Sequence, residues 1–83
     1  MKILYFAWLR ARIGRAEENV AVPAEVRDVK GLLDWLGERG AGYAAALENR
    51  AVIRIAVNRD YVGLDHPLRQ EDEVAIFPPV TGG

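Results

Sequence analysis

The chain has 83 residues, of which 51% are hydrophobic and 28% charged, with a formal net charge of −1 and no cysteine. These values predict one globular domain over residues 1–83 and exclude a basic surface for nucleic acid or an anionic membrane. The missing cysteines exclude a disulfide framework, a thiolate metal site and a cysteine nucleophile. No apolar run approaches the roughly 18 residues that cross a bilayer and no secretory signal is visible, so we expect a cytoplasmic protein.

The first third of the chain predicts two strands. Lys2–Trp8 is apolar at both parities, which is typical of a strand covered on both faces or of one with an apolar outer face. The alternation does not decide whether its odd- or even-numbered residues face the core. Leu9–Ile13 has room for one helical turn, which Gly14 would end. Glu18–Val22 predicts a second strand, ended by Pro23, and the short connection favours an antiparallel pair.

The clearest predicted helix begins after Asp28, whose carboxylate suits a helix N-terminus. Four apolar side chains then follow at i, i+3, i+4 and i+7 and form one stripe: Val29, Leu32, Leu33 and Leu36. We expect Trp35 to lie half-buried at the edge of this stripe. Arg39 and Gly40 predict a cationic last turn and a left-handed stop. A second, weaker helix is predicted over Tyr43–Leu47.

The second half of the chain predicts two strands joined by a turn. Val52–Val57 alternates, and one of its faces carries three branched residues: Ile53, Ile55 and Val57. Residues 58–60 have the composition of a turn, and Tyr61–Val62 follows as a very short strand.

The last strand is predicted over Glu73–Phe77, after a loop with one buried anchor, Leu68. We assign Val74 and Ile76 to the core and Phe77 to the outer face. Phe77 in the core is the alternative, if this strand is covered on both faces.

The predicted order is therefore strand, strand, helix, strand, short strand and strand. A hairpin, a helix and returning strands make an α+β fold in which a mixed sheet of four to five strands has one main helix packed across one face. This is a β-grasp (ubiquitin-like) layout. The pattern alone leaves a ferredoxin-like or split β-α-β arrangement open.

The last strand runs into a tail that we expect to be flexible. Its residues are Pro78, Pro79, Val80, Thr81, Gly82 and Gly83. The prolines stiffen the exit from the domain, and Pro79 to Gly83, when extended, spans roughly 15–18 Å. The glycines let its backbone approach another surface closely. A slim tail with a free carboxylate suits insertion into another protein's active site, and a frayed terminus is the alternative.

Segments along nearly the whole chain share the residues of one known family. They are Phe6-Ala7, Leu9-Arg10 and Gly14 near the start, Val57-Asn58 in the third strand, and Asp72–Ala75 followed by Phe77–Gly83. On these residues the sequence resembles the small subunits of molybdopterin synthase, which are ubiquitin-like sulfur carriers of molybdenum-cofactor biosynthesis. The sequence departs from the family at Ala11, where an acidic residue is frequent, and at Glu71, where glycine is. Neither departure touches the tail.

The resemblance implies a function for the last residue. Gly83 would be adenylated by an E1-like adenylyltransferase that uses ATP, and would then become a thiocarboxylate. The sulfur would come from a donor such as a cysteine desulfurase or a rhodanese-like protein. The large synthase subunit would receive the tail, and two sulfur transfers to cyclic pyranopterin monophosphate would make the molybdopterin dithiolene. The implied assembly is a heterotetramer of two small and two large subunits.

Site residues follow from the same argument. Phe77, on the outward parity of the last strand, is the predicted docking aromatic, and the resemblance adds Phe6 and Tyr61 to an apolar patch. Residues 78–82 would thread into the partner, where a Cβ at Gly82 would block a narrow channel. The chain shows no phosphate-cradling P-loop and no metal cluster, so we expect no intrinsic cofactor or metal and assign the catalytic residues to partners.

The remaining polar residues have simpler interpretations. His66, the only histidine, has no second basic or thiol partner in the sequence and is predicted to be a loop residue rather than a general base or metal ligand. Residues 71–73 predict a solvated acidic turn, and residues 17–18 a surface pair.

Three alternatives to this function differ in what happens at the tail. A thiamine-pathway sulfur carrier also ends in two glycines, although the Pro-Pro-Val-Thr run favours the molybdopterin family. A ubiquitin-like covalent modifier would join Gly83 to a lysine of a target. A stand-alone enzyme is disfavoured, because the sequence offers no constellation of nucleophile, base and metal.

Overall fold

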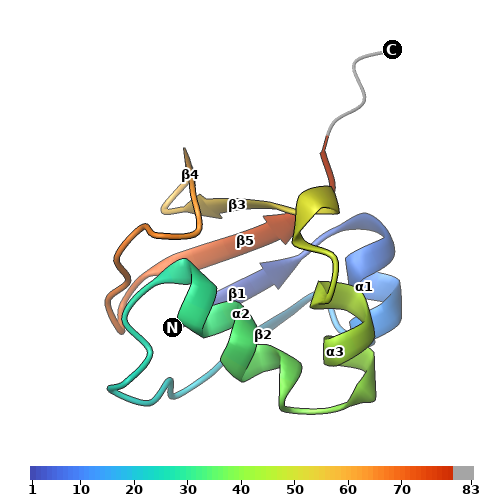
Figure 1. The fold of residues 1–83 in the computed structure, drawn as a ribbon, viewed down its shortest axis with the longest axis horizontal. Coiled ribbons are helices and arrows are strands. Elements are labelled where there is room, and N and C mark those ends of the chain that lie inside the picture. Colours follow the sequence, from blue (N-terminus) through green and yellow to red (C-terminus); the bar gives the residue numbers. More distant parts are fainter. Residues whose placement is uncertain (80–83) are drawn as a thin grey trace.

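The computed structural model describes residues 1–79 of the chain. They form a five-stranded mixed sheet with the order β2-β1-β5-β3-β4 and helices on one face (Figure 1). β1 pairs parallel to β5, and the other neighbouring strands pair antiparallel. The elements are β1 (Lys2–Tyr5), α1 (Ala7–Ile13), β2 (Glu17–Asn19), α2 (Val29–Gly37), α3 (Ala41–Leu47), the 3-10 helix η1 (Arg50–Val52), β3 (Arg54–Val57), β4 (Asp60–Val62) and β5 (Glu73–Phe77). This arrangement is a β-grasp, as the element order predicted. None of the helices in the described range has the length and apolar character that crossing a membrane requires.

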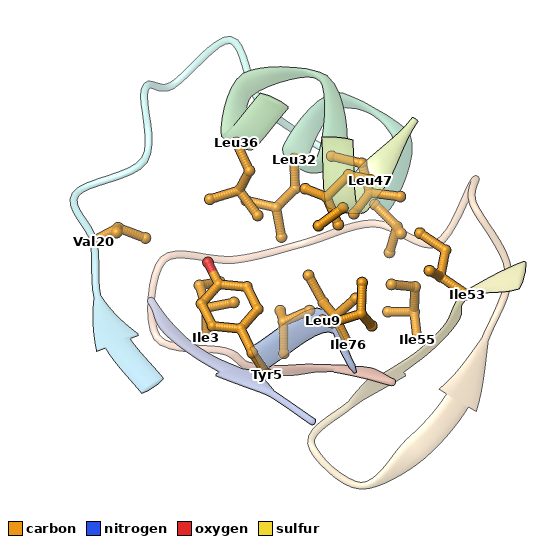
Figure 2. Close-up of a cluster of buried hydrophobic side chains, with 14 of the residues drawn as sticks. Ile3, Tyr5, Leu9, Val20, Leu32, Leu36, Leu47, Ile53, Ile55 and Ile76 are labelled. Atoms are coloured by element: carbon orange, nitrogen blue, oxygen red, sulfur yellow. The ribbon is translucent and has the colours of Figure 1, made fainter. Parts of the chain in front are cut away.

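The hydrophobic core lies between the inner face of the sheet and the helices (Figure 2). Ile3 and Tyr5 of β1 are 0% and 1% exposed, so the odd-numbered residues of the first strand face the core. Ile55 and Ile76 are partners across β3 and β5 and continue this inner face. The apolar stripe of α2 is buried against it, which stabilises a helix that contains two glycines.

Helix α2 begins as predicted and ends differently. Asp28 caps it, because its Oδ1 accepts a hydrogen bond of 2.8 Å from a backbone N–H in the first turn. Trp35 is half-buried beside the core, as expected. The predicted left-handed stop at Gly40 is wrong. The helix ends at Gly37, and Gly40 has an extended backbone with a φ of 163° and directly precedes α3.

The first strand is shorter than predicted. β1 stops at Tyr5, and Trp8 belongs to α1 instead of the strand. The chain reverses at Ala7, whose backbone is left-handed with a φ of 54°, and α1 then buries Leu9. Gly14 ends the helix in the left-handed conformation, with a φ of 89°, as its position predicted.

Two other strands are also shorter than predicted, each for a local reason. β2 ends at Asn19, where its pairing with β1 reaches the start of that strand: the next two residues, Val20 and Met1, still exchange backbone hydrogen bonds of 2.9 Å and 3.0 Å. β3 begins only at Arg54, because the preceding residues form η1, which the side chain of Asn49 caps. β5 has the predicted bounds, and β4 begins one residue earlier than predicted, at Asp60. Leu68 packs against the core but is only partly buried.

Glu18 is buried, although the sequence predicted a surface pair at residues 17–18. Its Oε2 accepts hydrogen bonds from the hydroxyls of Tyr5 at 2.6 Å and Tyr43 at 2.7 Å. Its Oε1 accepts from the guanidinium groups of Arg15 at 3.2 Å and Arg39 at 2.8 Å. Arg39 lies past the end of α2, so the predicted cationic last turn is wrong: the last turn of α2 contains no basic residue. We call these five residues the Glu18 cluster.

The pKa values in the Glu18 cluster favour a charged carboxylate on Glu18 next to a charged guanidinium on Arg39. Burial by itself raises the pKa of Glu18, but hydrogen bonds from both tyrosines and Arg39 outweigh burial and hold this pKa below its usual value. Burial, followed by the hydrogen bond to Glu18, raises the pKa of Tyr5 far above its usual range. The carboxylate is therefore ionised and the tyrosine hydroxyl protonated at neutral pH.

The predicted solvated turn at residues 71–73 is also wrong in part. Asp72 is 8% exposed. Its Oδ2 accepts a hydrogen bond of 2.8 Å from the backbone N–H of Arg69, and its Oδ1 accepts one of 2.9 Å from the side-chain amide of Asn58. Asp72 therefore links the turn before β5 to the hairpin between β3 and β4.

Candidate functional site

Three aromatic side chains come together where the chain leaves the sheet. Phe6 directly follows β1, Tyr61 lies in β4 and Phe77 ends β5. Phe6 is 47% exposed and Tyr61 is 80% exposed. The ring centroids of Tyr61 and Phe77 lie 5.5 Å apart with an interplanar angle of 43°. Strands that are far apart in the sequence thus bring together the three residues that the sequence named for docking, and that role stays a prediction.

The alternation of β5 explains the direction of Phe77. Val74 and Ile76 are both 0% exposed on the inner face, so Ala75 and Phe77 point to the outer face. Phe77 is half-buried there, next to Tyr61. The alternative in which Phe77 belongs to the core is therefore excluded.

Small residues form the floor of this surface. Ala56 of β3 pairs with Ala75 on one side and with Tyr61 on the other, and directly paired residues share a face of the sheet. A shallow depression of about 370 Å³ results, lined by Phe6, Tyr61, Ala75, Phe77 and Pro78. We call these five residues the docking patch. An exposed group of aromatic side chains around a hollow is typical of a surface that binds another protein.

One cation lies at the rim of the docking patch. Arg54 pairs with Phe77 across β3 and β5, and both line a second hollow of about 390 Å³ that reaches Pro79. The guanidinium of Arg54 donates hydrogen bonds to the backbone carbonyls of Ala51 at 3.1 Å and Ile53 at 2.9 Å. Sequence reasoning assigned Arg54 no role, although its outward parity in the alternating strand was visible.

The root of the tail belongs to the same surface. Pro78 lines the docking patch, and Pro79 lines the neighbouring hollow. The other predicted threading residues, Val80, Thr81 and Gly82, lie outside the described residues, as does Gly83, the predicted carrier of sulfur.

Metal ligands and shifted pKa values do not mark a second candidate site within residues 1–79. Within residues 1–79, no group of three or more histidine, aspartate or glutamate side chains is placed to hold a metal ion. The described groups with clearly shifted pKa values all belong to the Glu18 cluster, whose polar atoms are hydrogen-bonded to one another. These features indicate a structural cluster, and leave the aromatic surface beside the tail as the candidate site.

His66 lines a polar cleft on another part of the surface. The cleft measures about 550 Å³, and its lining mixes acidic, basic and amide side chains. His66 is half-buried in the loop before Pro67. Two other lining residues are hydrogen-bonded to each other, since the side-chain amide of Asn58 donates to the carboxylate of Asp72. The loop position of His66 agrees with the prediction.

Comparisons with known proteins match the whole length of the chain. The model of the ThiS family matches residues 3–83. The molybdopterin synthase sulfur carrier subunit of Escherichia coli is 41% identical over 83 residues, which cover all of this chain and 99% of that protein. The subunit of the same name from Haemophilus influenzae is 33% identical over 87 residues, with coverage of 100% and 99%.

Three solved structures resemble the fold over at least 95% of this chain. A candidate molybdopterin converting factor subunit 1 from Pyrococcus furiosus superposes with a TM-score of 0.78 at 33% identity and 95% coverage of both chains. The small archaeal modifier protein 1 of Haloferax volcanii gives 0.74 at 29% identity, with coverage of 96% and 97%. A Helicobacter pylori protein, from a complex of subunits 1 and 2 of molybdopterin-converting factor, gives 0.65 at 25% identity, with coverage of 99% and 96%.

These similarities extend over both the β-grasp domain and the diglycine ending. The chain therefore belongs to the ThiS family, together with the molybdopterin synthase sulfur carrier subunits.

Proposed function

We propose that this chain is the sulfur-carrying small subunit of a molybdopterin synthase, and that Gly83 carries the sulfur as a thiocarboxylate. The observation that carries the proposal is the position of the docking patch at the root of a tail that ends in two glycines. The full-length similarity to the Escherichia coli sulfur carrier subunit supports it.

The chemistry requires an activating partner. A carboxylate is a poor electrophile, because its negative charge repels nucleophiles and its oxygen is a poor leaving group. An E1-like adenylyltransferase would join the carboxylate of Gly83 to AMP and release pyrophosphate from ATP. The outer sulfur of a persulfide on a cysteine desulfurase or rhodanese-like donor would then attack the acyl-adenylate and displace AMP. A thiol of the partner enzymes would cleave the resulting acyl disulfide, which leaves the thiocarboxylate on Gly83 and a disulfide on the partners. We place these steps in the cytoplasm, where ATP is available.

Delivery of the sulfur requires a second partner. The Helicobacter pylori relative comes from a complex of subunits 1 and 2, which supports a large subunit as the partner of this chain. The docking patch would bind it, with Phe77 as the central aromatic, while residues 78–83 enter its active site. Cyclic pyranopterin monophosphate would accept the sulfur there, and hydrolysis would return Gly83 to the carboxylate. Two small subunits would bind a dimer of large subunits.

Reconstitution tests this function directly. The purified chain is incubated with the activating enzyme, ATP, a sulfur donor, the large subunit and cyclic pyranopterin monophosphate. Intact mass should show the exchange of one oxygen for sulfur in the carrier, and molybdopterin should form. Deleting Gly83, or adding one residue after it, should abolish both signals, and an unchanged melting temperature would show that the domain is intact. Sulfur transfer by either altered chain would refute the proposal.

A second candidate function is covalent modification of other proteins. Its support is the similarity to the small archaeal modifier protein 1 of Haloferax volcanii. A modifier forms conjugates of higher mass that survive a denaturing gel and depend on Gly83. A carrier devoted to sulfur transfer yields only the thiocarboxylate form. Supplying a thiamine-pathway acceptor in place of the large subunit distinguishes the remaining type of carrier.

A further inference from the structure

The start of α1 departs from the usual rules for a helix N-terminus at two successive residues. Phe6 is the N-cap residue and makes no side-chain capping hydrogen bond, although a serine, threonine, aspartate or asparagine there would contribute about 1 kcal/mol. Ala7, the next residue, has a left-handed backbone with a φ of 54°. This conformation costs a residue with a Cβ roughly 1–2 kcal/mol.

Left-handed non-glycine residues are rare in the described chain. Among residues 1–79 they are Ala7, Asn58 and Arg59. Asn58 and Arg59 form the two-residue turn between β3 and β4, where a hairpin requires positive φ. Ala7 is not part of a hairpin, so its conformation needs another explanation.

Ala7 allows the chain to pass from strand to helix within one residue. Phe6 still follows the sheet: its backbone is extended, with φ −126° and ψ 155°, and its N–H donates to the carbonyl of Ile76 at 3.2 Å. Its own carbonyl already accepts the first helical bond, from the N–H of Arg10 at 3.4 Å. The left-handed backbone of Ala7, which we call the joint, lets Phe6 keep both the sheet hydrogen bond of its N–H and the helical hydrogen bond of its carbonyl.

The side chains around the joint differ in how firmly they are held. Tyr5 before it and Leu9 after it are 1% and 0% exposed in the core. Phe6 is 47% exposed. If residue 7 became right-handed or extended, the displacement would fall on Phe6, because moving either core residue would open a cavity.

We infer that Ala7 is a positioning residue of the docking patch, whose left-handed backbone directs Phe6 toward Phe77 and Pro78. The inference rests on the proposed function, since it assumes that the large subunit binds this patch. Phe6 departs from the usual N-cap preference and Ala7 from the usual backbone preference, and neither departure stabilises the helix. Departures of this kind are typical of functional sites.

The test compares substitutions that differ mainly in backbone preference. Ala7 is exposed, so Ala7→Val adds no atoms to the core but strongly disfavours positive φ. We expect it to weaken binding to the large subunit about tenfold or more, an effect worth about 1.4 kcal/mol. The conservative Ala7→Gly variant accepts the same φ and should bind within about twofold of the original chain. Affinity is measured by isothermal titration calorimetry.

A matched control separates the joint from the helix. Ala11→Val introduces the same exposed β-branched side chain in α1, at a residue that is not left-handed. We expect it to leave the affinity within about twofold. An equal loss of affinity for Ala11→Val and Ala7→Val would assign the effect to helix propensity and overturn the inference.

A double-mutant cycle with Phe6→Ala decides whether Ala7 acts through Phe6. Once the ring is absent, Ala7→Val should cost no further affinity. Additive losses would overturn the inference and leave the patch intact. If Phe6→Ala alone changes nothing, the docking role of Phe6 fails, and the inference fails with it. Thermal melts of every variant identify the temperature at which all are folded, and the titrations are run there.

Discussion

The Glu18 cluster provides the sharpest test of how this small domain is held together. We predict that Glu18→Gln lowers the free energy of unfolding by about 2 kcal/mol at neutral pH. Glutamine keeps the shape but removes the charge, and replaces one acceptor oxygen by an NH₂ group. If the amide oxygen faces the two arginines, the NH₂ group faces the hydroxyls of Tyr5 and Tyr43. The buried Tyr5 hydroxyl then loses the group to which it donates at 2.6 Å.

The magnitude follows from counting what is lost and discounting what water replaces. Hydrogen bonds to a charged group contribute about 1.5–3 kcal/mol, against roughly 0.5–1.5 kcal/mol for neutral ones. The side chains of Arg15 and Arg39 are 53% and 32% exposed, so water recovers much of their loss. The net loss should therefore stay below the 3–5 kcal/mol typical of breaking a fully buried ion pair. For a domain of this size, 2 kcal/mol corresponds to a fall in melting temperature of roughly 8–16 °C.

The pH dependence gives the prediction a sign. The folded pKa of Glu18 is lowered from the ordinary value of 4.5, so the unfolded chain takes up the proton first as the pH falls. The contribution of Glu18 to stability is thus fully present above about pH 5 and is lost as the pH falls through 4.5 toward the folded pKa. The stability gap between the original chain and Glu18→Gln should narrow below about pH 4.

Urea denaturation at a series of pH values measures this gap. Glu17→Gln is the matched control, because its ion pair with Lys2, at 3.4 Å, joins two side chains that are 56% and 44% exposed. It should change the free energy of unfolding by less than about 0.5 kcal/mol. Equal stability of Glu18→Gln and the original chain at pH 7, or a gap that stays constant into acid, would refute the reasoning.

Three further predictions concern docking and the glycines of the helices. Phe77→Ala should weaken binding to the large subunit by about tenfold or more in a calorimetric titration, and an unchanged affinity would show that the partner binds elsewhere. Gly42→Ala should destabilise the domain by about 1–3 kcal/mol in thermal melts, because a Cβ at Gly42 would lie 2.8 Å from the carbonyl oxygen of Arg12 in α1. Gly37→Ala, where a Cβ meets nothing within 4 Å, should raise stability by up to about 1 kcal/mol. A Gly42→Ala variant as stable as the original chain would mean that α1 and α3 separate at little cost.

Local periodicity explains which parts of the fold the sequence could predict. The apolar stripe of α2, its Asp28 cap and the alternation of β5 depend on residues within a few positions of one another. The end of β1 did not follow from such a pattern, because the reversal depends on a left-handed Ala7, and alanine carries no sequence signal for that conformation. At Gly40 a sequence signal was present but did not apply. Glycine is typical of a left-handed helix stop, whereas the backbone of Gly40 is extended.

Buried polar groups were missed because their partners are distant in sequence. Glu18 looks like a surface residue beside Glu17, and only the fold brings Tyr5, Arg39 and Tyr43 to its carboxylate. Alternation predicted that Phe77 faces outward. Phe6 and Tyr61 required the resemblance to a family, because Phe6 follows β1 and Tyr61 lies in β4, which are far apart in the sequence and have β5 and β3 between them in the sheet.

The docking patch contributes little to the stability of the isolated domain, and this is an argument for its function. The core is complete without it: sheet and helices bury Ile3, Tyr5 and Ile76 almost entirely. Tyr61, in contrast, leaves 80% of its surface in water, so it gains only a small part of the roughly 1.5–3 kcal/mol that burying a large apolar side chain contributes. The rest is realised only when another surface covers the ring. Substitutions in the docking patch should therefore change the affinity for the large subunit far more than the free energy of unfolding. Substitutions in the Glu18 cluster should change the free energy of unfolding far more than this affinity.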